Sequence, residues 1–291
     1  MKRNKKAIIL TFFMCAGLAL GGCKASENDA AEDGGKLIVA AAIVPEQTFI
    51  QKVCGDLVKV TVMIPPGFSP ENYEPKPAQM EEFSDAAVYF AMGVPAEEQS
   101  ILPSLSETTE LVSLSDICRE QFGELKIGQE GRDPHIWLSP KRAMLMVQTI
   151  ADTMGRIDPQ NKATYESNAK AYIEEISTAD EEIKTLLEPL QEKSFMVFHP
   201  AFGYFADEYS LTMYALEQEG KEVTAATLSS MIDLAREKGI RTIFYQAQTD
   251  GSRCEAFAQE IGGTAVMLDP LSPDYVENLR LMAAAIAEGA K

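Results

Sequence analysis

The segment DPQNKATYESNAKAYIEEISTADEEIKTLLEPL, residues 158–190, predicts one unusually long helix. Asp158 is suited to cap it, Pro159 to occupy its first position, and Pro189 to stop it. Apolar residues recur in it at helical spacing, with acidic residues on the other faces: Ile173, Ile176, Ile183, Leu186, Leu187 and Leu190. A helix of roughly 30 residues spans on the order of 45 Å. It is therefore predicted to bridge two lobes as a stiff strut.

Short apolar runs lie on both sides of this helix. They cover residues 37–43, 58–63, 87–90 and 110–114 before it, and 195–198, 211–216, 242–245 and 265–268 after it. Near-continuous apolar strands that alternate with helices are typical of parallel sheets covered on both faces. We therefore predict an α/β protein with two lobes, each built on a mostly parallel four-stranded sheet and joined by one long helix.

This reading divides the chain into an N-terminal lobe over residues 36–157, the linking helix over 158–190, and a C-terminal lobe over 191–291. A helix before the linking helix is expected to begin at Ser139-Pro140. The last helix is expected to begin at Ser272-Pro273, because serine is a favoured N-cap and proline a favoured first helical residue.

The first 22 residues are predicted to be a lipoprotein signal peptide. Four basic residues within positions 2–6 precede an apolar stretch, residues 7–20, that is too short and wrongly flanked for a spanning helix. Small residues then precede Cys23, which resembles a bacterial lipoprotein cleavage site with lipid attached to that sulfur. Residues 23–35 are small and polar, as in a flexible tether. The mature protein is therefore expected outside the cytoplasm, lipid-anchored to the bacterial cell membrane.

The charge balance argues against a nucleic-acid partner. The chain has 44 acidic and 26 basic residues, a formal net charge of −18. Removal of the signal peptide takes away four positive charges and no negative ones, which lowers the net charge to −22. Such a surface repels phosphate backbones and mildly attracts cations.

The cysteines beyond the signal and the lipid site are Cys54, Cys118 and Cys254. Their odd number permits at most one internal disulfide. No CxxC or CxH spacing indicates a thiolate metal site, so we interpret them as structural.

The chain has two histidines, and each lies at the boundary of a predicted element. His135 sits in a proline-bounded loop before a helix, and His199 directly follows the strand over residues 195–198. A neutral imidazole is the commonest protein metal ligand, so their placement favours a metal site. For either one alone, the alternative is an ordinary surface or core histidine.

Carboxylates occur in comparable places. Asp269 directly follows the last predicted strand, and a loop with five prolines, residues 65–77, holds Glu71 and Glu74. Ligands bind at the carboxyl ends of the strands in parallel α/β sheets. Groups from both halves of the chain are therefore expected to face one cleft.

Four segments in this order resemble the cluster A-I substrate-binding proteins, the zinc- and manganese-binding lipoproteins of bacterial ABC importers. They are PENYEPKP at 70–77, DPHIWL at 133–138, FHPAFGY at 198–204 and LDPL at 268–271. The segment EQEGKE at 217–222 also resembles a turn in the second lobe of that family. The resemblance covers the mature chain and implies the same fold, two α/β lobes joined by a long helix.

The resemblance also implies a ligand set, carried over position by position. Glu71 stands where the family usually has its first ligand, a histidine, and His135 and His199 match the second and third. The acidic fourth ligand matches Asp269. A shift of three residues would place Ser272 there instead, but Ser272 has a competing role as a helix cap. The alternative roles are a solvated loop residue for Glu71 and a loop-capping carboxylate for Asp269.

Two imidazoles and two carboxylates form a set between those typical of zinc and of manganese. The histidine at position 199 is a zinc-type feature of the family, so Zn²⁺ is the expected substrate and Mn²⁺ the alternative. Many zinc members have a histidine-rich loop where this chain has residues 119–133. That segment lacks histidine, so such a loop is missing or acts through Glu120, Glu124 and Glu130.

The resemblance implies a non-enzymatic role: capture of the metal between two lobes and delivery to the permease and ATPase of an ABC importer, by a monomer. Two other functions stay open. A surface adhesin would share this fold, and a secreted zinc hydrolase would use the same ligands. The chain has no His-Glu-x-x-His motif and no serine or cysteine nucleophile motif.

Overall fold

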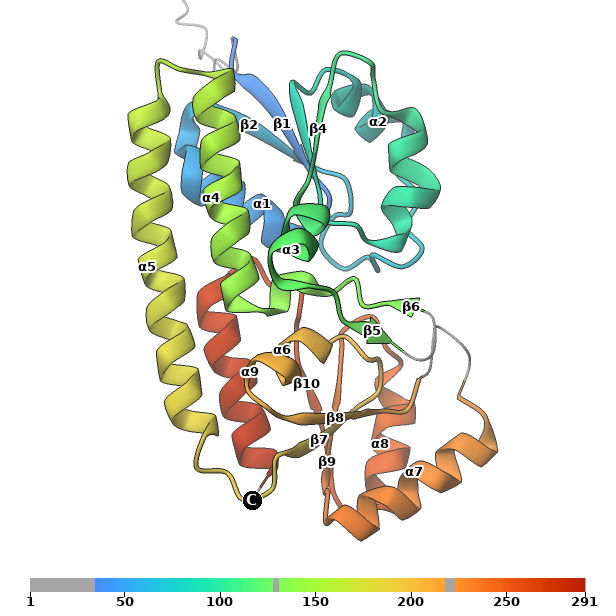
Figure 1. Cartoon of the computed structure of the whole chain (residues 1–291). Helices are drawn as coiled ribbons and strands as arrows, with labels where there is room; N and C mark the ends of the chain where they lie inside the picture. The colour runs from blue at the N-terminus through green and yellow to red at the C-terminus, as the bar shows by residue number, and fades with distance from the viewer. Residues whose placement is uncertain (1–34, 128–130, 218–222, 291) are drawn as a thin grey trace, which may run out of the picture. The chain divides into compact units, whose positions relative to one another are not determined.

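Two four-stranded parallel sheets organise the chain. The structure is a computed structural model that describes residues 35–127, 131–217 and 223–290. The strands of the first sheet lie in the order β2-β1-β3-β4 (Figure 1). Their bounds are β1 Leu37–Ala41, β2 Val58–Val62, β3 Val88–Ala91 and β4 Glu110–Ser113.

The second sheet repeats this topology. Its strands lie in the order β10-β9-β7-β8, so the first strand of each lobe separates the second strand from the third. Their bounds are β7 Ser194–Val197, β8 Thr212–Ala215, β9 Thr242–Tyr245 and β10 Thr264–Met267. In each lobe the strand order therefore reverses at one point, and the crevice beside that point is where parallel sheets bind ligands.

The predicted fold class and all eight predicted strands are confirmed, with ends that differ by two residues at most. Strands such as β3 are buried along their whole length, and this burial explains why they read as continuous apolar runs. A small antiparallel pair, β5 (Lys126–Ile127) with β6 (Gly131–Arg132), was not predicted. Two-residue strands leave no periodicity to detect.

Helices connect the strands and cover the sheets. Their bounds are α1 Val44–Cys54, α2 Pro77–Ser84, α3 Leu114–Phe122, α4 Pro140–Ile157, α5 Lys162–Leu187, α6 Gly203–Glu208, α7 Ala225–Lys238, α8 Gly251–Glu260 and α9 Tyr275–Gly289. The predicted start at Ser139-Pro140 is confirmed for α4. The predicted start at Ser272-Pro273 is wrong: α9 begins at Tyr275, and the Ser272 hydroxyl accepts the Asp274 backbone N–H instead.

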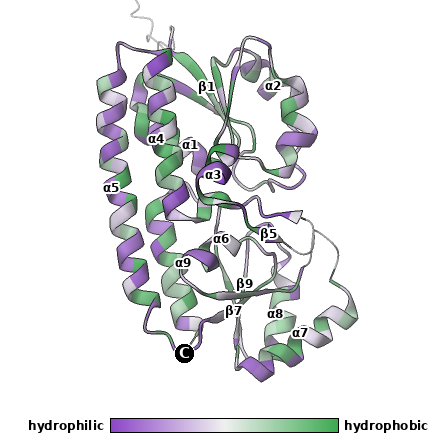
Figure 2. Ribbon diagram, in the orientation of Figure 1, coloured by the Kyte–Doolittle hydropathy of each residue, from purple (hydrophilic) through white to green (hydrophobic). Residues whose placement is uncertain are grey.

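The long helix α5 is confirmed, and its 26 residues give it a length of roughly 39 Å. It packs against α1 and α4 from the first half of the chain and against α9 from its end. Figure 1 shows it alongside α4 and then α9, and Figure 2 shows hydrophilic and hydrophobic bands along it. The prediction that Asp158 caps α5 is wrong. Asp158 follows α4 and accepts hydrogen bonds from Asn161 and Tyr165.

One continuous core joins both lobes. It runs from the first sheet through α1, α4 and α5 to buried residues of α9 and to Phe195 and Val197 on β7. A second, smaller cluster fills the space between the other face of the second sheet and helices α7 and α8. Because the lobes share packed side chains, large separations between them would expose apolar surface.

The described cysteines Cys54, Cys118 and Cys254 are buried and free. Burial raises the pKa of the first two thiols to about 12 and that of Cys254 to about 11. These thiols are therefore protonated near neutral pH and unsuited to metal binding. The signal peptide, Cys23 and nearly all of the tether lie outside the described residues. Within those residues, no helix has both the length and the apolarity needed to cross a membrane.

Candidate metal centre

Glu71 is presented by the loop between β2 and α2. The loop is tied at several points: the Pro70 carbonyl accepts the Ala96 N–H at 2.9 Å, and the Ser69 hydroxyl accepts the Glu71 N–H at 3.2 Å. Downstream, the buried Tyr73 donates its hydroxyl to Gln79 at 2.6 Å. The Glu71 side chain stays 38% exposed, so it combines a fixed backbone with access to solvent.

His135 is presented by the turn that leads into α4. The Asp133 carboxylate accepts both the His135 backbone N–H at 2.9 Å and its Nδ1–H at 2.8 Å. Both residues are buried. Asp133 therefore sets the position and the orientation of the ring, and it leaves Nε2 as the free ring atom.

His199 comes from the second lobe, at the carboxyl end of β7. The backbone pairing of β7 with β8 continues past the strands, since Glu217 N–H donates to the Phe198 carbonyl at 2.8 Å. This places the Glu217 carboxylate beside the ring, where it accepts Nδ1–H at 2.8 Å. The two histidines thus have equivalent partners built from different local structures.

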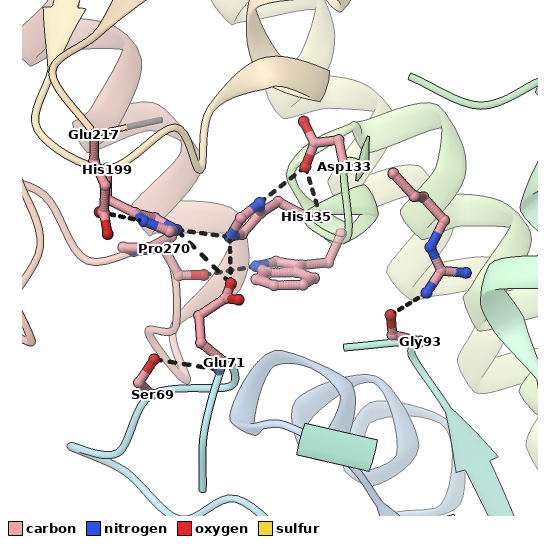
Figure 3. A network of polar contacts seen from close by, with 10 residues as sticks. Ser69, Glu71, Gly93, Asp133, His135, His199, Glu217 and Pro270 are labelled. Atoms are coloured by element: carbon pink, nitrogen blue, oxygen red, sulfur yellow. Dashed lines mark hydrogen bonds and ion pairs between the residues drawn. The ribbon is translucent and has the colours of Figure 1, made fainter. Parts of the chain in front are cut away.

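The three predicted ligands Glu71, His135 and His199 converge on one point (Figure 3). The two Nε2 atoms lie 3.4 Å apart, and Glu71 Oε1 lies 3.9 Å from that of His135 and 3.8 Å from that of His199. Two nitrogens that are each about 2.0–2.1 Å from a tetrahedral zinc ion lie roughly 3.3–3.4 Å apart. The imidazoles therefore already have the separation of a zinc shell, and Glu71 needs a shift of a few tenths of an ångström.

The positions of the protons on the two imidazole rings make the point between Glu71, His135 and His199 attractive to a cation. An ionised carboxylate only accepts hydrogen bonds, so Asp133 and Glu217 hold the ring protons on Nδ1. Both Nε2 atoms then direct lone pairs toward the Glu71 carboxylate and toward each other. A metal ion satisfies all three groups at once, whereas two facing lone pairs cannot hydrogen-bond one another.

Asp269 is not part of this group of ligand atoms. Its carboxylate accepts the Leu271 N–H at 3.0 Å, which closes a turn in the loop between β10 and α9. The residue lines a small cavity together with Gln248 and the backbone turn of residues 64–67. In the described geometry Asp269 thus makes the contact of a loop-capping carboxylate, and its role as the fourth ligand stays a prediction.

Trp137 ties the His135 turn to the Asp269 loop. Its Nε1–H donates to the Pro270 carbonyl at 2.8 Å, and its own carbonyl accepts the Tyr275 hydroxyl at 2.7 Å. The indole ring centre lies 5.3 Å from that of His135. A movement of one lobe relative to the other would therefore disturb the surroundings of this tryptophan.

Asp133, Glu217 and Trp137 were not predicted to have roles in the site. The role of Asp133 could have been predicted from the sequence, because a carboxylate two residues before a candidate ligand can fold back on it. The role of Glu217 could not, since Glu217 reaches His199 only through the pairing of β7 with β8. Of the acids proposed for a metal-gathering loop, Glu124 approaches Arg132 at 3.9 Å and Glu130 lies outside the described residues.

Known proteins share this fold and much of this sequence. Residues 39–289 match the model of the family described as "Zinc-uptake complex component A periplasmic". The high-affinity zinc uptake system protein ZnuA of Paracoccus denitrificans is 30% identical over 286 residues, which cover 82% of this chain and 87% of that protein. A crystal structure of ZnuA superposes with a TM-score of 0.82 at 33% identity, over 88% of this chain and 100% of the other.

The zinc-binding lipoprotein AdcA of Streptococcus pneumoniae is 29% identical over 284 residues, which cover 92% of this chain and 55% of AdcA. The chain thus spans about half the length of that relative. The family model, in contrast, matches nearly all of the described residues, and this match shows the family. The chain belongs to the family of zinc-uptake complex component A.

Proposed function

We propose that this protein is the extracytoplasmic substrate-binding component of a metal ABC importer. It captures one divalent transition-metal ion between its lobes and delivers it to the permease. The observation that carries the proposal is the convergence of Glu71, His135 and His199, from both lobes, within 4.8 Å of one another. The names of its relatives, a zinc-binding lipoprotein and a zinc uptake protein, support the same role.

Zinc is the favoured substrate, with manganese as the alternative. Neutral imidazoles that are 3.4 Å apart suit a tetrahedral zinc shell, whereas manganese prefers more oxygen ligands. The fourth position is left to the second Glu71 oxygen, to water, or to Asp269 after a change in its loop. Glu71 in place of a neutral histidine adds a negative charge, which offsets part of the charge of the ion.

The division of the ligands between the two lobes explains how the ion would be captured and released. Glu71 and His135 belong to one lobe and His199 to the other, so closure of the lobes completes the shell. A small separation would remove His199 with its Glu217 partner and leave two ligands, which lowers affinity. The shared core and the helix α5 limit such movement to small shifts.

The remaining features of the proposal come from the sequence. Lipid on Cys23 would hold the protein at the membrane, beside its permease and ATPase partners, and we expect a monomer. We infer binding without catalysis, because the converging groups are all accounted for as ligands and their partners. No contact among the described residues favours adhesion or hydrolysis over transport.

Titration of the metal-free mature protein with zinc is expected to show one site per chain, with nanomolar or tighter affinity. Structural zinc sites bind with about 10–16 kcal/mol near pH 7. Calorimetry gives the stoichiometry, and the fluorescence of Trp137, the one tryptophan of the chain, should change because its ring lies 5.3 Å from His135. Competition with manganese then ranks the two ions. Absence of tight binding for both would refute the proposal.

Gly203→Ala is expected to lower zinc affinity about 10-fold without altering a ligand. A Cβ on Gly203, the first residue of α6, would overlap the Asp133 carboxylate. The displaced carboxylate would orient His135 less well, and loss of such a partner typically costs 10- to 100-fold in affinity. Gly155→Ala is the matched control, because its Cβ meets the flexible Lys162 side chain. Equal affinities of the two variants would contradict this role for Asp133.

A further inference from the structure

A buried carboxylate organises the turn that follows β3. Glu97 has no exposed surface, and its two oxygens accept four hydrogen bonds. Oε1 accepts the Tyr89 hydroxyl at 2.5 Å and the Met92 N–H at 3.2 Å, and Oε2 accepts the N–H groups of Gly93 at 2.5 Å and Val94 at 2.7 Å. One side chain thus holds three consecutive backbone amides.

The same turn contacts the two segments that present the ligands of the first lobe. On one side, Ala96 N–H donates to the carbonyl of Pro70, the residue before Glu71. On the other, the Gly93 carbonyl accepts from the guanidinium of Arg132, the residue before Asp133 (Figure 3). Each contact lies one residue away from a group that ligates or that orients a ligand.

The packing of the turn leaves little freedom. Gly93 has φ +82°, and a Cβ there would lie 2.6 Å from the Ser115 hydroxyl and 2.9 Å from Arg132 Nη2. Gly93 is therefore needed both for its backbone conformation and for the approach of Arg132. A displacement of the turn would move the Arg132 and Pro70 contacts together.

We propose that Glu97 is a positioning residue for the metal site, because its carboxylate fixes the turn that spaces Glu71 from His135. This inference rests on the proposed metal-binding function. Glu97 touches no ligand and acts through Pro70 and Arg132. The burial of a carboxylate is costly, and the fourfold hydrogen bonding offsets that cost while it imposes one conformation on the turn.

Glu46 provides a matched control in the same lobe. It is equally buried, and its carboxylate accepts the Ala42 N–H at 2.5 Å in the turn between β1 and α1. Glu46 therefore has the burial of Glu97 but belongs to a different turn. A general effect of replacing a buried carboxyl group should appear in Glu46→Gln and Glu97→Gln alike.

The experiment compares wild type, Glu97→Gln and Glu46→Gln in the mature protein. Hydrogen–deuterium exchange of the metal-free forms should show faster exchange of the Ala96 amide in Glu97→Gln alone. With metal, Glu97→Gln should bind zinc about 10-fold more weakly. Its Co²⁺ complex should have a changed ligand-field spectrum, whereas Glu46→Gln should keep the wild-type affinity and spectrum.

Gly93→Ala strains the same turn, keeps Glu97, and should reproduce these effects if Glu97→Gln fails to fold. Wild-type affinity and an unchanged Co²⁺ spectrum in a folded Glu97→Gln protein would overturn the proposal, as would equal losses in Glu46→Gln. If wild type itself bound neither zinc nor manganese, the metal-binding function would be refuted. Exchange of the Ala96 amide would then still decide whether Glu97 holds the turn against Pro70.

Discussion

His199→Ala is expected to lower zinc affinity on the order of 100- to 1,000-fold, and His135→Ala by a similar factor. If the about 10–16 kcal/mol of a structural zinc site is shared among four ligands, each accounts for roughly 3–4 kcal/mol. A factor of ten corresponds to about 1.4 kcal/mol. Competition with a chelating dye measures the affinity, and thermal unfolding of the metal-free variants shows that each is folded. Unchanged affinity in both variants would refute the site.

Two carboxylate comparisons complete this series. Glu71→Gln is expected to weaken binding, while Glu74→Gln, an exposed residue of the same loop, should not. Asp269→Asn distinguishes the two roles of that residue. A large loss would mean that its loop rearranges to supply the fourth ligand, and wild-type affinity would leave it with the Leu271 turn.

The contribution of Glu97 to the free energy of unfolding of the metal-free protein is expected to fall as the pH rises. Burial raises the pKa of this carboxyl from 4.5 to about 7, against the opposing effect of its hydrogen bonds. The folded state therefore holds the proton more tightly than the unfolded state. The resulting stabilisation is complete below about pH 4.5 and is lost as the pH rises through 7, by roughly 3 kcal/mol in total.

Urea unfolding of wild type and Glu97→Gln across this pH range isolates the effect. The two proteins differ only at position 97, so the difference between them reports this carboxyl together with its effect on Glu46, whose pKa is raised by burial and by the charge of Glu97. The stability of wild type relative to the variant should decrease as the pH rises from about 4.5 to 7. A constant difference would show that Glu97 keeps an ordinary pKa in the folded protein.

The partners of the ligands are arranged differently in the two lobes. In the first lobe, Asp133 holds its histidine through local backbone and side-chain bonds, two residues apart in sequence. In the second lobe, Glu217 reaches His199 across paired strands. The Gly203 and Trp137 contacts then connect the His135 turn to the second lobe. Lobe position and histidine orientation are therefore physically linked.

Periodicity and strand composition were sufficient to predict the eight parallel strands and the long helix. Buried strands such as β3 and the amphipathic helix α5 leave strong patterns, because burial of a face demands apolar residues at fixed spacing. Patterns of this kind do not locate helix ends. Asp158 and Ser272 both have the chemistry of an N-cap, yet each accepts other local hydrogen bonds, and α5 and α9 begin a few residues later.

The sequence by itself determined the fold class and identified the two histidines as candidate metal ligands. Through its resemblance to a family, it also gave Glu71 as a third candidate. Only the tertiary structure brought these three together, placed Asp133 and Glu217 beside the two imidazoles, and placed the Asp269 carboxylate on the Leu271 N–H. The reason is physical. Local patterns report which side chains are buried, but a metal shell depends on contacts between segments far apart in the chain.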